Sequence, residues 1–246
     1  VFDAPGKNFR HEMYPEYKAT RVKAPPEFLE QVPRMYEVVK ALNLPLSIVP
    51  GVEADDVIGT LARAAAEQGR DVVIVSGDKD LLQLVGDHVR MYDPGKGDDG
   101  MLWKTEEVRE RFGVGPDHVT DALALIGDTA DNVPGVRQVG PVKAAKLLAE
   151  YQTLENLYAH LDAIPGKLRE YLELDRDQAF FARELVTVKT DVDVSTDLAD
   201  YERRPWDKSA LVACFRELGF HSLLEDVESG TPPAEGGSMT TLSATK

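Results

Sequence analysis

The sequence predicts an α/β fold in which a mostly parallel central sheet is flanked by helices and followed by a helical region. Two observations predict the sheet: residues 46–49 and 72–75 are short apolar runs, and a segment with helical periodicity, 53–69, lies between them. The third observation is that helical periodicity dominates from residue 105 onward. At 246 residues, the chain has room for one large domain or two small ones.

The α/β part can be justified element by element. In segment 53–69 the apolar residues recur every three or four positions, which predicts a helix, and Gly69 is placed to end it. Segment 72–75 reads Val-Val-Ile-Val, a continuous apolar run that predicts a strand buried on both faces. Residues 89–92 predict a further short strand, and Val1-Phe2 has the pattern of a strand that runs into a turn.

The remaining chain predicts helices and then a tail. The predicted helices span 105–112, 118–126, 142–151, 154–160, 175–186 and 208–218. Residues 229–246 are rich in Gly, Pro, Ser and Thr, which predicts a flexible linker or tail. We therefore expect an α/β core over 1–104 with a basic segment at about 7–42, a helical part over 105–228, and the tail.

Composition and charge exclude several classes of protein. The single cysteine, Cys214, excludes an internal disulfide, and no apolar run reaches the roughly 20 residues that span a bilayer. The first residues lack a leader pattern, so we expect a reducing cytoplasm and no membrane partner. Neither a Ser-His-Asp set nor a Walker phosphate loop is present in the sequence.

The net charge of −15 argues against a nucleic-acid partner, but basic residues gather in two places. Residues 7–23 hold five basic side chains against two acids. Residues 132–149 hold Arg137, Lys143 and Lys146 and no acid. These two segments either bind a polyanion or form ordinary solvated faces, and charge alone does not decide between the two interpretations.

Carboxylates repeatedly follow the predicted strands. They form four groups, which are Asp3, then Glu53, Asp55 and Asp56, then Asp78 and Asp80, and finally Asp128 and Asp131. Each group alone would suit a helix N-terminus, a cap or a turn. Because ligands bind at the carboxyl ends of parallel strands, three of the groups should converge on one edge of the sheet. Mg²⁺ or Mn²⁺ would offset their mutual repulsion there and would activate water for hydrolysis.

The second basic segment has the pattern of a helix-hairpin-helix. Gly135 and Gly140 would allow a tight turn, and Pro141 suits the first position of the following helix. The N-terminus of that helix would offer free N–H groups to a phosphate, with Lys143 and Lys146 on one side. The alternative is an ordinary helical hairpin with two solvent-exposed lysines.

Together these residues resemble the flap endonuclease family, in particular the 5′ nuclease domains of bacterial DNA polymerase I. The resemblance covers about residues 1–225. It rests on five segments in this order: Val-Phe-Asp-Ala-Pro-Gly-Lys, Tyr-Lys-Ala-Thr-Arg, Val-Glu-Ala-Asp-Asp-Val, Gly-Asp-Lys-Asp-Leu and Gly-Asp-Thr-Ala-Asp-Asn-Val-Pro-Gly-Val. It implies a PIN-like or resolvase-like α/β domain and a helical part with a helix-hairpin-helix, also described as a helix-three-turn-helix.

The resemblance also implies roles for individual residues. Two metal clusters are implied, the first formed by Asp3, Glu53, Asp55 and Asp56 and the second by Asp78, Asp80, Asp128 and Asp131. In the basic segment, Lys18 and Arg21 would meet the scissile phosphate with Arg10 beside them, and Tyr17 would stack on a base. Gly135, Arg137, Gly140, Lys143 and Lys146 would hold duplex DNA. Two or more Mg²⁺ or Mn²⁺ ions are implied, with a K⁺ ion at the hairpin.

The implied activity is that of a 5′→3′ exonuclease and 5′ flap endonuclease acting on flaps, nicks, branched duplexes and RNA primers in replication and repair. A polymerase domain would follow in the parent chain, in a bacterial, nucleoid-associated setting. The family's first strand carries an aspartate in a Leu-Ile-Asp-Gly-like segment upstream of Val1. The alternative expectation is therefore a DNA-binding fragment with impaired catalysis.

Overall fold

The computed structural model describes residues 1–229. The predicted tail, 229–246, lies outside the described residues apart from Ser229, which ends a helix. The described chain forms two compact units, the first made of Val1–Val22 and Ser47–Thr196. The second consists of Lys23–Leu46 together with the described residues from Asp197 onward. The basic segment predicted at about 7–42 therefore contributes to both units.

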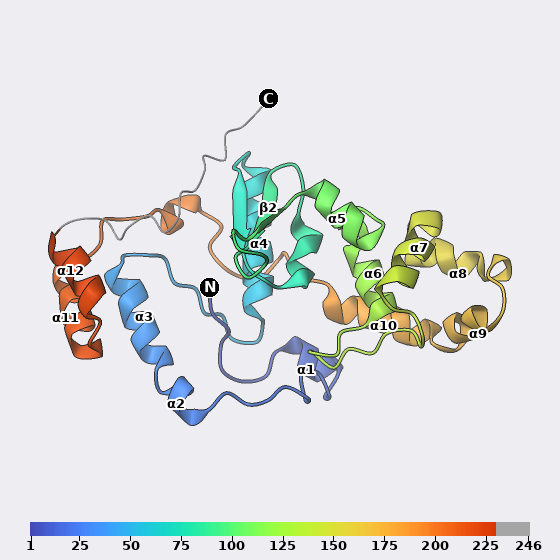
Figure 1. Ribbon diagram of the computed structural model, residues 1–246, viewed down its shortest axis with the longest axis horizontal. Coiled ribbons are helices and arrows are strands. Elements are labelled where there is room, and N and C mark those ends of the chain that lie inside the picture. The colour runs from blue at the N-terminus through green and yellow to red at the C-terminus, as the bar shows by residue number, and fades with distance from the viewer. Residues whose placement is uncertain (230–246) are drawn as a thin grey trace. The chain divides into compact units, whose positions relative to one another are not determined.

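A small mixed sheet lies in the first unit (Figure 1). Its strands are β1 (Val72–Val75), β2 (Val89–Asp93) and β3 (Met101–Trp103), in the order β1-β2-β3. β1 and β2 are parallel, with Ile74 opposite Met91, whereas β2 and β3 are antiparallel. Residues 46–49, predicted as a strand, are not one, although the Phe2 N–H donates to the Ser47 carbonyl at 3.0 Å. The α/β class is confirmed, with one parallel and one antiparallel pairing in the described sheet.

β1 is buried on one face only, which corrects the prediction of a strand buried on both faces. Ile74 is 5% exposed, but Val73 and Val75 are 46% and 66% exposed. Val73 and Val75 share a face because side chains alternate along a strand. Among the described residues nothing covers that face, so the apolar run reports strand propensity rather than burial on both sides.

Helices and short 3₁₀ turns pack against the sheet and continue into the helical part of the first unit. Helix α4 packs on β1, and α5 packs on β3. All six helices predicted after residue 105 occur, with each end shifted by one residue at most. The helix predicted over 53–69 is α4, whose N-cap is Glu53 and whose C-cap is Gln68. The elements of this unit are α1 (Phe9–Met13), α4 (Ala54–Glu67), η1 (Lys79–Leu84), α5 (Thr105–Phe112), η2 (Pro116–His118), α6 (Val119–Ile126), α7 (Pro141–Tyr151), α8 (Leu154–Ala159), η3 (Leu161–Ala163), α9 (Lys167–Leu174) and α10 (Arg176–Val186).

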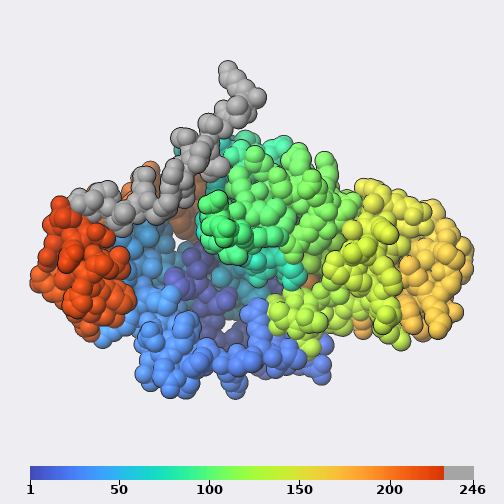
Figure 2. Space-filling model, viewed as in Figure 1, coloured from blue at the N-terminus to red at the C-terminus, as the bar shows by residue number. Residues whose placement is uncertain are grey.

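Helix α6 is the centre of this helical packing. It contacts α10, α7 and η1, and its Val119, Leu123 and Leu125 are at most 1% exposed. The space-filling view shows the green α5–α6 region and the yellow-green α7 region against each other without a break (Figure 2). One hydrophobic core therefore joins the sheet to the helices that follow it. The predicted boundary at residue 104 does not separate compact units.

The second unit is helical and has its own small core. It contains α2 (Pro26–Leu29), α3 (Val32–Ala41), η4 (Leu198–Tyr201), α11 (Lys208–Leu218) and α12 (His221–Ser229). Ala41, Leu211, Phe215 and Val227 are buried together. Of its helices, only α11 follows the sequence prediction. No helix in residues 1–229 is long and apolar enough to cross a membrane.

Candidate active site

The N-terminus of α4 carries the first acidic group. Glu53 is the N-cap residue, and Asp55 and Asp56 occupy the first turn, where the helix dipole favours negative charge. Asp3 reaches the same helix end, since its Oδ1 accepts the Ala54 N–H at 2.8 Å. The structure thus brings all four residues of the first predicted cluster to one helix terminus.

The second acidic group begins at the end of β1. Asp78 caps η1 by accepting the Asp80 N–H at 2.9 Å. Asp80 Oδ1 is buried and has no hydrogen-bond partner, and the ammonium of Lys79 is 3.5 Å away. Burial, reinforced by Asp78 and Asp128 against the charge of Lys79, raises the pKa of Asp80 to about 7. An unpaired buried carboxylate oxygen is costly unless a ligand or proton satisfies it.

Asp128 and Asp131 lie in the turn after α6. Asp128 Oδ1 accepts the Ala130 N–H at 2.8 Å, and a backbone bridge to Val133 closes the turn. Lys79 forms a hydrogen bond and ion pair with Asp128. Burial opposes ionisation of Asp128, but Lys79 outweighs it and lowers the pKa of Asp128. Lys79 lies within the Gly-Asp-Lys-Asp segment, where no local pattern predicts its pairing with the distant Asp128.

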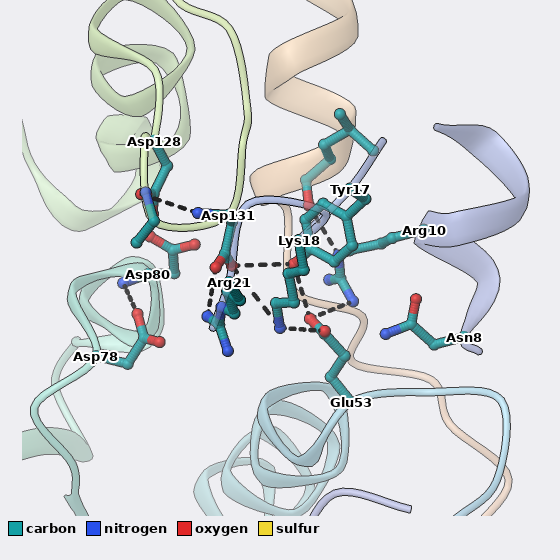
Figure 3. Close-up of polar contacts among 12 residues, drawn as sticks. Asn8, Arg10, Tyr17, Lys18, Arg21, Glu53, Asp78, Asp80, Asp128 and Asp131 are labelled. Carbon is teal, nitrogen blue, oxygen red and sulfur yellow. Dashed lines mark hydrogen bonds and ion pairs between the residues drawn. The ribbon is translucent and has the colours of Figure 1, made fainter. Parts of the chain in front are cut away.

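The basic segment folds over these carboxylates (Figure 3). Lys18 pairs with Glu53 and lies 3.7 Å from an Asp131 oxygen, while Arg21 pairs with Asp131. The Lys18 N–H also donates to the Asp131 carbonyl at 2.9 Å. Lys18 has a φ of 57°, which is uncommon for a residue with a side chain. The two predicted phosphate contacts therefore lie directly on the predicted metal ligands.

Tyr17 has a different environment from the one predicted for it. Its side chain is buried at 4% exposure, so its ring is not presented for stacking on a base. Its hydroxyl lies 3.0 Å from Glu53 Oε2 and 3.2 Å from Asp131 Oδ2. Burial and these two carboxylates raise the pKa of the phenol. In this conformation Tyr17 bridges the first acidic group to the second and cannot stack on a base.

Arg10 and Asp56 also depart from their predicted roles. Arg10 is 2% exposed and Asp56 is fully buried, and the two form a bidentate ion pair. Asp56 additionally accepts the backbone N–H groups of Glu53 and Lys189. Its oxygens are therefore saturated by protein donors, which leaves no site for a metal ion, and Arg10 cannot reach a phosphate from there.

The remaining carboxylates converge. The pKa of Asp55 is raised to about 7, first by burial and then by the charges of Asp78 and Glu53. Helix α4 contacts both β1 and η1, which brings Asp78, the N-cap of η1, to the same helix that carries Asp55. In the described part of the chain, Asp55 and Asp78 form no ion pair, unlike Glu53, Asp128 and Asp131.

These donors fit divalent cations. Within residues 1–229 and in this conformation, no three Asp, Glu, His or Cys side chains are grouped closely enough to hold a metal ion. Lys18, Arg21 and Lys79 are ion-paired with part of the acidic set. The donors are carboxylate oxygens, which Mg²⁺ and Mn²⁺ prefer. Asp80 supplies a buried oxygen that accepts no hydrogen bond, and burial, reinforced by neighbouring carboxylates, raises the pKa values of Asp55 and Asp80.

The hairpin between α6 and α7 differs from its predicted construction. A Cβ at Gly135 would overlap the backbone of Gly127, so Gly135 allows a close approach of two chain segments rather than a tight turn. Gly140 is the N-cap of α7 with open space around it. Gln138, with a φ of 61°, lies at the turn itself. Lys143 donates to the Gln138 carbonyl at 2.8 Å.

The basic residues of the hairpin are not equivalent. Lys143 and Lys146 are exposed. Arg137 instead forms a forked ion pair with Asp175, at 2.6 Å between Nη2 and Oδ1, and its backbone N–H donates to the same carboxylate at 2.8 Å. Residues 132–149 contain no acidic residue, but Asp175 at the start of α10 supplies one from outside the segment. Arg137 is therefore ion-paired within the protein in this conformation.

Converging carboxylates next to lysine and arginine, on a mixed α/β core that continues into a helical hairpin, form a candidate site for metal-assisted hydrolysis. Comparisons with known proteins agree. The model of the 5′-3′ exonuclease N-terminal resolvase-like domain matches residues 1–113, and that of the 5′-3′ exonuclease C-terminal SAM fold matches residues 114–209. The chain belongs to the 5′-3′ exonuclease family, as the sequence motifs predicted.

Relatives with curated sequences are bacterial polymerases. The chain is 44% identical over 224 residues to DNA polymerase I of Chloroflexus aurantiacus, which covers 89% of this chain and 24% of that protein. It is 41% identical over 237 residues to DNA polymerase I of Bacillus caldotenax. The aligned region covers 96% of this chain and 27% of that protein. The chain spans about a quarter of the length of these relatives.

Solved structures confirm the fold. A complex of the bacteriophage T5 flap endonuclease with DNA and metal ions matches with a TM-score of 0.64 and 22% identity, over 92% of this chain and 81% of that one. The catalytic core of Rad2 in complex with DNA matches with a TM-score of 0.63 and 16% identity, over 92% and 76% of the two chains. The resolvase-like α/β class followed by a helical part is therefore confirmed.

Proposed function

We propose that this chain hydrolyses phosphodiester bonds at 5′ ends and 5′ flaps of DNA, using two or more divalent cations. The observation that carries the proposal is the convergence of Asp55, Asp78 and Asp80 beside Lys18 and Arg21. Family membership and the DNA and metal complex of the T5 flap endonuclease support it.

Seven carboxylates remain as proposed metal ligands once Asp56 is removed from the set. The two groups are Asp3, Glu53 and Asp55, and then Asp78, Asp80, Asp128 and Asp131. When bound, divalent cations lower the pKa of a water molecule and stabilise charge on the leaving oxygen. Mg²⁺ is the proposed ion, with Mn²⁺ as a substitute, and the K⁺ ion at the hairpin stays a prediction.

Lys18 and Arg21 are the proposed catalytic cations. They now neutralise Glu53 and Asp131, so engagement of these carboxylates by metal would release both side chains. Released, they can neutralise the charge that develops on the scissile phosphate, which is a large contribution to catalysis in a site of low dielectric. Arg10 is not included, because it is buried against Asp56.

The hairpin is the proposed duplex clamp. The 11-residue helix α7 begins at Pro141, its N-terminal dipole end favours an anion, and the exposed Lys143 and Lys146 lie in its first two turns. Such contacts position DNA without reading its sequence. Arg137 joins this surface only if it leaves Asp175.

The proposed partners follow from the relatives. These are DNA polymerases, so we propose a polymerase domain in the parent protein, a bacterial cytoplasmic setting at the nucleoid, and flaps, nicks and primer ends, RNA included, as substrates.

Cleavage of a 5′-labelled flap tests the function. The chain, and a version extended upstream through the aspartate-bearing strand of the family, are assayed in Mg²⁺ and in EDTA, with Asp78→Ala as the control. We expect cleavage that needs Mg²⁺ and is lost in Asp78→Ala. Flap binding without cleavage by both proteins would instead establish a DNA-binding module. Equal affinity for flap and plain duplex, without cleavage, would contradict both functions.

A further inference from the structure

The most completely bonded charged pair near the site is Arg10–Asp56. Nη1 of Arg10 donates to Oδ2 of Asp56 at 2.7 Å, and Nη2 donates to Oδ1 at 2.8 Å. The side chains are 3% and 0% exposed. Burying two charges is costly unless their geometry is good and their other hydrogen bonds are satisfied. The bidentate geometry meets the first of these conditions.

The remaining hydrogen bonds of the pair are also satisfied. Nε of Arg10 donates to the Leu185 carbonyl at 2.8 Å, and Nη2 donates to the Thr187 carbonyl at 2.9 Å. Both carbonyls belong to the C-terminal end of α10, where the helix dipole favours a cation. Oδ1 of Asp56 accepts the Lys189 N–H at 2.9 Å. The pair therefore fastens α1 and α4 to the end of α10.

The last partner of the pair is Glu53. Its backbone N–H donates to Oδ2 of Asp56 at 3.0 Å, and its Oε2 lies 3.3 Å from Nη1 of Arg10. Tyr17 and Lys18 also form hydrogen bonds with the Glu53 side chain. Lys18 is the residue that must leave Glu53 in the proposed reaction. Arg10 and Asp56 are then the part of the surroundings of Glu53 that stays in place.

We propose that Arg10 and Asp56 are a positioning pair that fixes Glu53 for metal binding, and that neither residue contacts metal or DNA. This rests on the proposed function, in which Glu53 holds a divalent cation. Residues that orient metal ligands typically contribute about 10- to 100-fold to metal affinity or activity. A buried salt bridge that only stabilises the fold would contribute to the free energy of unfolding but not to metal affinity.

The matched control is a second arginine that pairs with a buried aspartate in the same unit. Arg183 Nη1 donates to Oδ1 of Asp121 at 2.9 Å, and Asp121 is 3% exposed and accepts the Leu154 N–H. Arg183→Gln removes a cation from a buried aspartate, as Arg10→Gln does, but it leaves Glu53 untouched. A difference between the two variants therefore reports on Glu53 and not on stability alone.

The experiment measures Mn²⁺ binding by titration calorimetry, well below the melting temperature of each variant. We expect Arg10→Gln to weaken Mn²⁺ binding about 10-fold, Arg10→Lys to weaken it less, and Arg183→Gln to leave it unchanged. Flap binding in EDTA should stay within about twofold of the original chain for Arg10→Gln. In cleavage, the Mg²⁺ concentration for half-maximal rate should rise while KM for DNA does not.

A paired substitution separates positioning from folding. Replacing both residues by apolar ones, Arg10→Met with Asp56→Leu, removes the buried charges and can preserve stability. We expect this double variant to fold and still to bind Mn²⁺ about 10-fold more weakly. If Arg10→Gln does not fold, Mn²⁺ binding by the double variant decides whether the pair positions Glu53.

Three results would overturn the proposal. They are unchanged Mn²⁺ affinity in the folded Arg10 variants or in the double variant, equal weakening in Arg183→Gln, and loss of flap binding in EDTA, which would make Arg10 a phosphate contact. If the original chain neither binds Mn²⁺ nor cleaves in its extended form, the proposed function fails instead. Cleavage with an unaffected Arg10→Gln sinks only the positioning role.

Discussion

The acidic site and the α6–α7 hairpin both lie in the first unit and both carry basic residues, but they use them differently. At the acidic site, Lys18 and Arg21 are ion-paired with carboxylates that come from distant parts of the chain. At the hairpin, Lys143 and Lys146 are exposed and bound to no carboxylate in the described residues. One set of cations is therefore held by the protein, and the other is already available to a polyanion.

This difference determines what each region requires before it can act. The hairpin can meet a phosphate backbone as it stands, and its contribution should depend on salt and not on metal. The acidic site must exchange its internal cations for others first, because Glu53 and Asp131 are neutralised by Lys18 and Arg21. Changes at the site should therefore alter metal dependence and rate, whereas changes at the hairpin should alter affinity.

The largest effect is expected from Lys18→Ala. The variant is made in whichever protein cleaves the flap, the chain itself or its version extended upstream. Loss of a cation at the scissile phosphate should lower the single-turnover cleavage rate of that protein about 10²- to 10³-fold. The same change frees Glu53, so Mn²⁺ binding without DNA should become tighter, measured by calorimetry. Weaker Mn²⁺ binding in Lys18→Ala would contradict the exchange of cations at this site. Lys7→Ala, at an exposed position of the same basic segment, is the control.

The pH dependence of stability should reveal the uncompensated charge. In the metal-free protein, the pKa of Asp80 is raised from 3.8 to about 7, so the folded state holds its proton more tightly than the unfolded state. The contribution of Asp80 to the free energy of unfolding is therefore fully present below about pH 4. It is lost as the pH rises to 7, a fall of roughly 2–4 kcal/mol. Melting temperatures in EDTA from pH 5 to 8 measure this fall.

Asp80→Asn is the matched variant for the pH series. It keeps the shape of Asp80 and removes the charge, so it should flatten the decline and raise stability at pH 8. Because Asp55 has a pKa of about 7 for the same reason, part of the slope should remain. Addition of Mn²⁺ at pH 8 should stabilise the original chain more than the variant. An unchanged slope in Asp80→Asn would remove this carboxylate from the acidic centre.

The two regions also differ in how much of them the sequence could predict. Val72–Val75, 89–92 and the helices after residue 105 were predictable, because period and capping residues are local signals. Helix α2 begins at Pro26, and α3 has Pro33 at its second position. Both prolines are compatible with a helix start, but neither helix was predicted. Strand β3 is three residues long, too short for a clear alternation.

Side-chain pairing is the part that the sequence could not supply. Arg10 and Asp56 are 46 positions apart, and Arg137 and Asp175 are 38 apart. The sequence predicted each arginine to contact phosphate because its acidic partner is distant in sequence. Folding of the chain is what brings the two partners together. The acidic residues were easier to predict, since their place at a strand end or helix start is local. Pairing in the folded chain then decided which of them remain available to a metal.

The glycines of the hairpin separate backbone approach from turn formation. Gly135→Ala should cost roughly 2–3 kcal/mol, because its Cβ would overlap the backbone of Gly127. Gly140→Ala should cost less than about 1 kcal/mol, since that position has open space and only N-cap preference is lost. Urea unfolding of both variants measures the difference. Equal losses would show that the turn, and not the close approach, sets the requirement for glycine.

The smallest effects distinguish the free cations of the hairpin from the bound one. Lys146→Ala should weaken flap binding a few-fold and lower the salt dependence by about one unit, with no change in melting temperature. Arg137→Ala should barely change the salt dependence, because Asp175 already neutralises it, but should lower the melting temperature by about 2–4 °C. Fluorescence anisotropy across a salt series, in EDTA, measures both slopes. A full unit lost in Arg137→Ala would show that this arginine leaves Asp175 for the DNA backbone, and that the hairpin, like the acidic site, exchanges an internal partner when it binds.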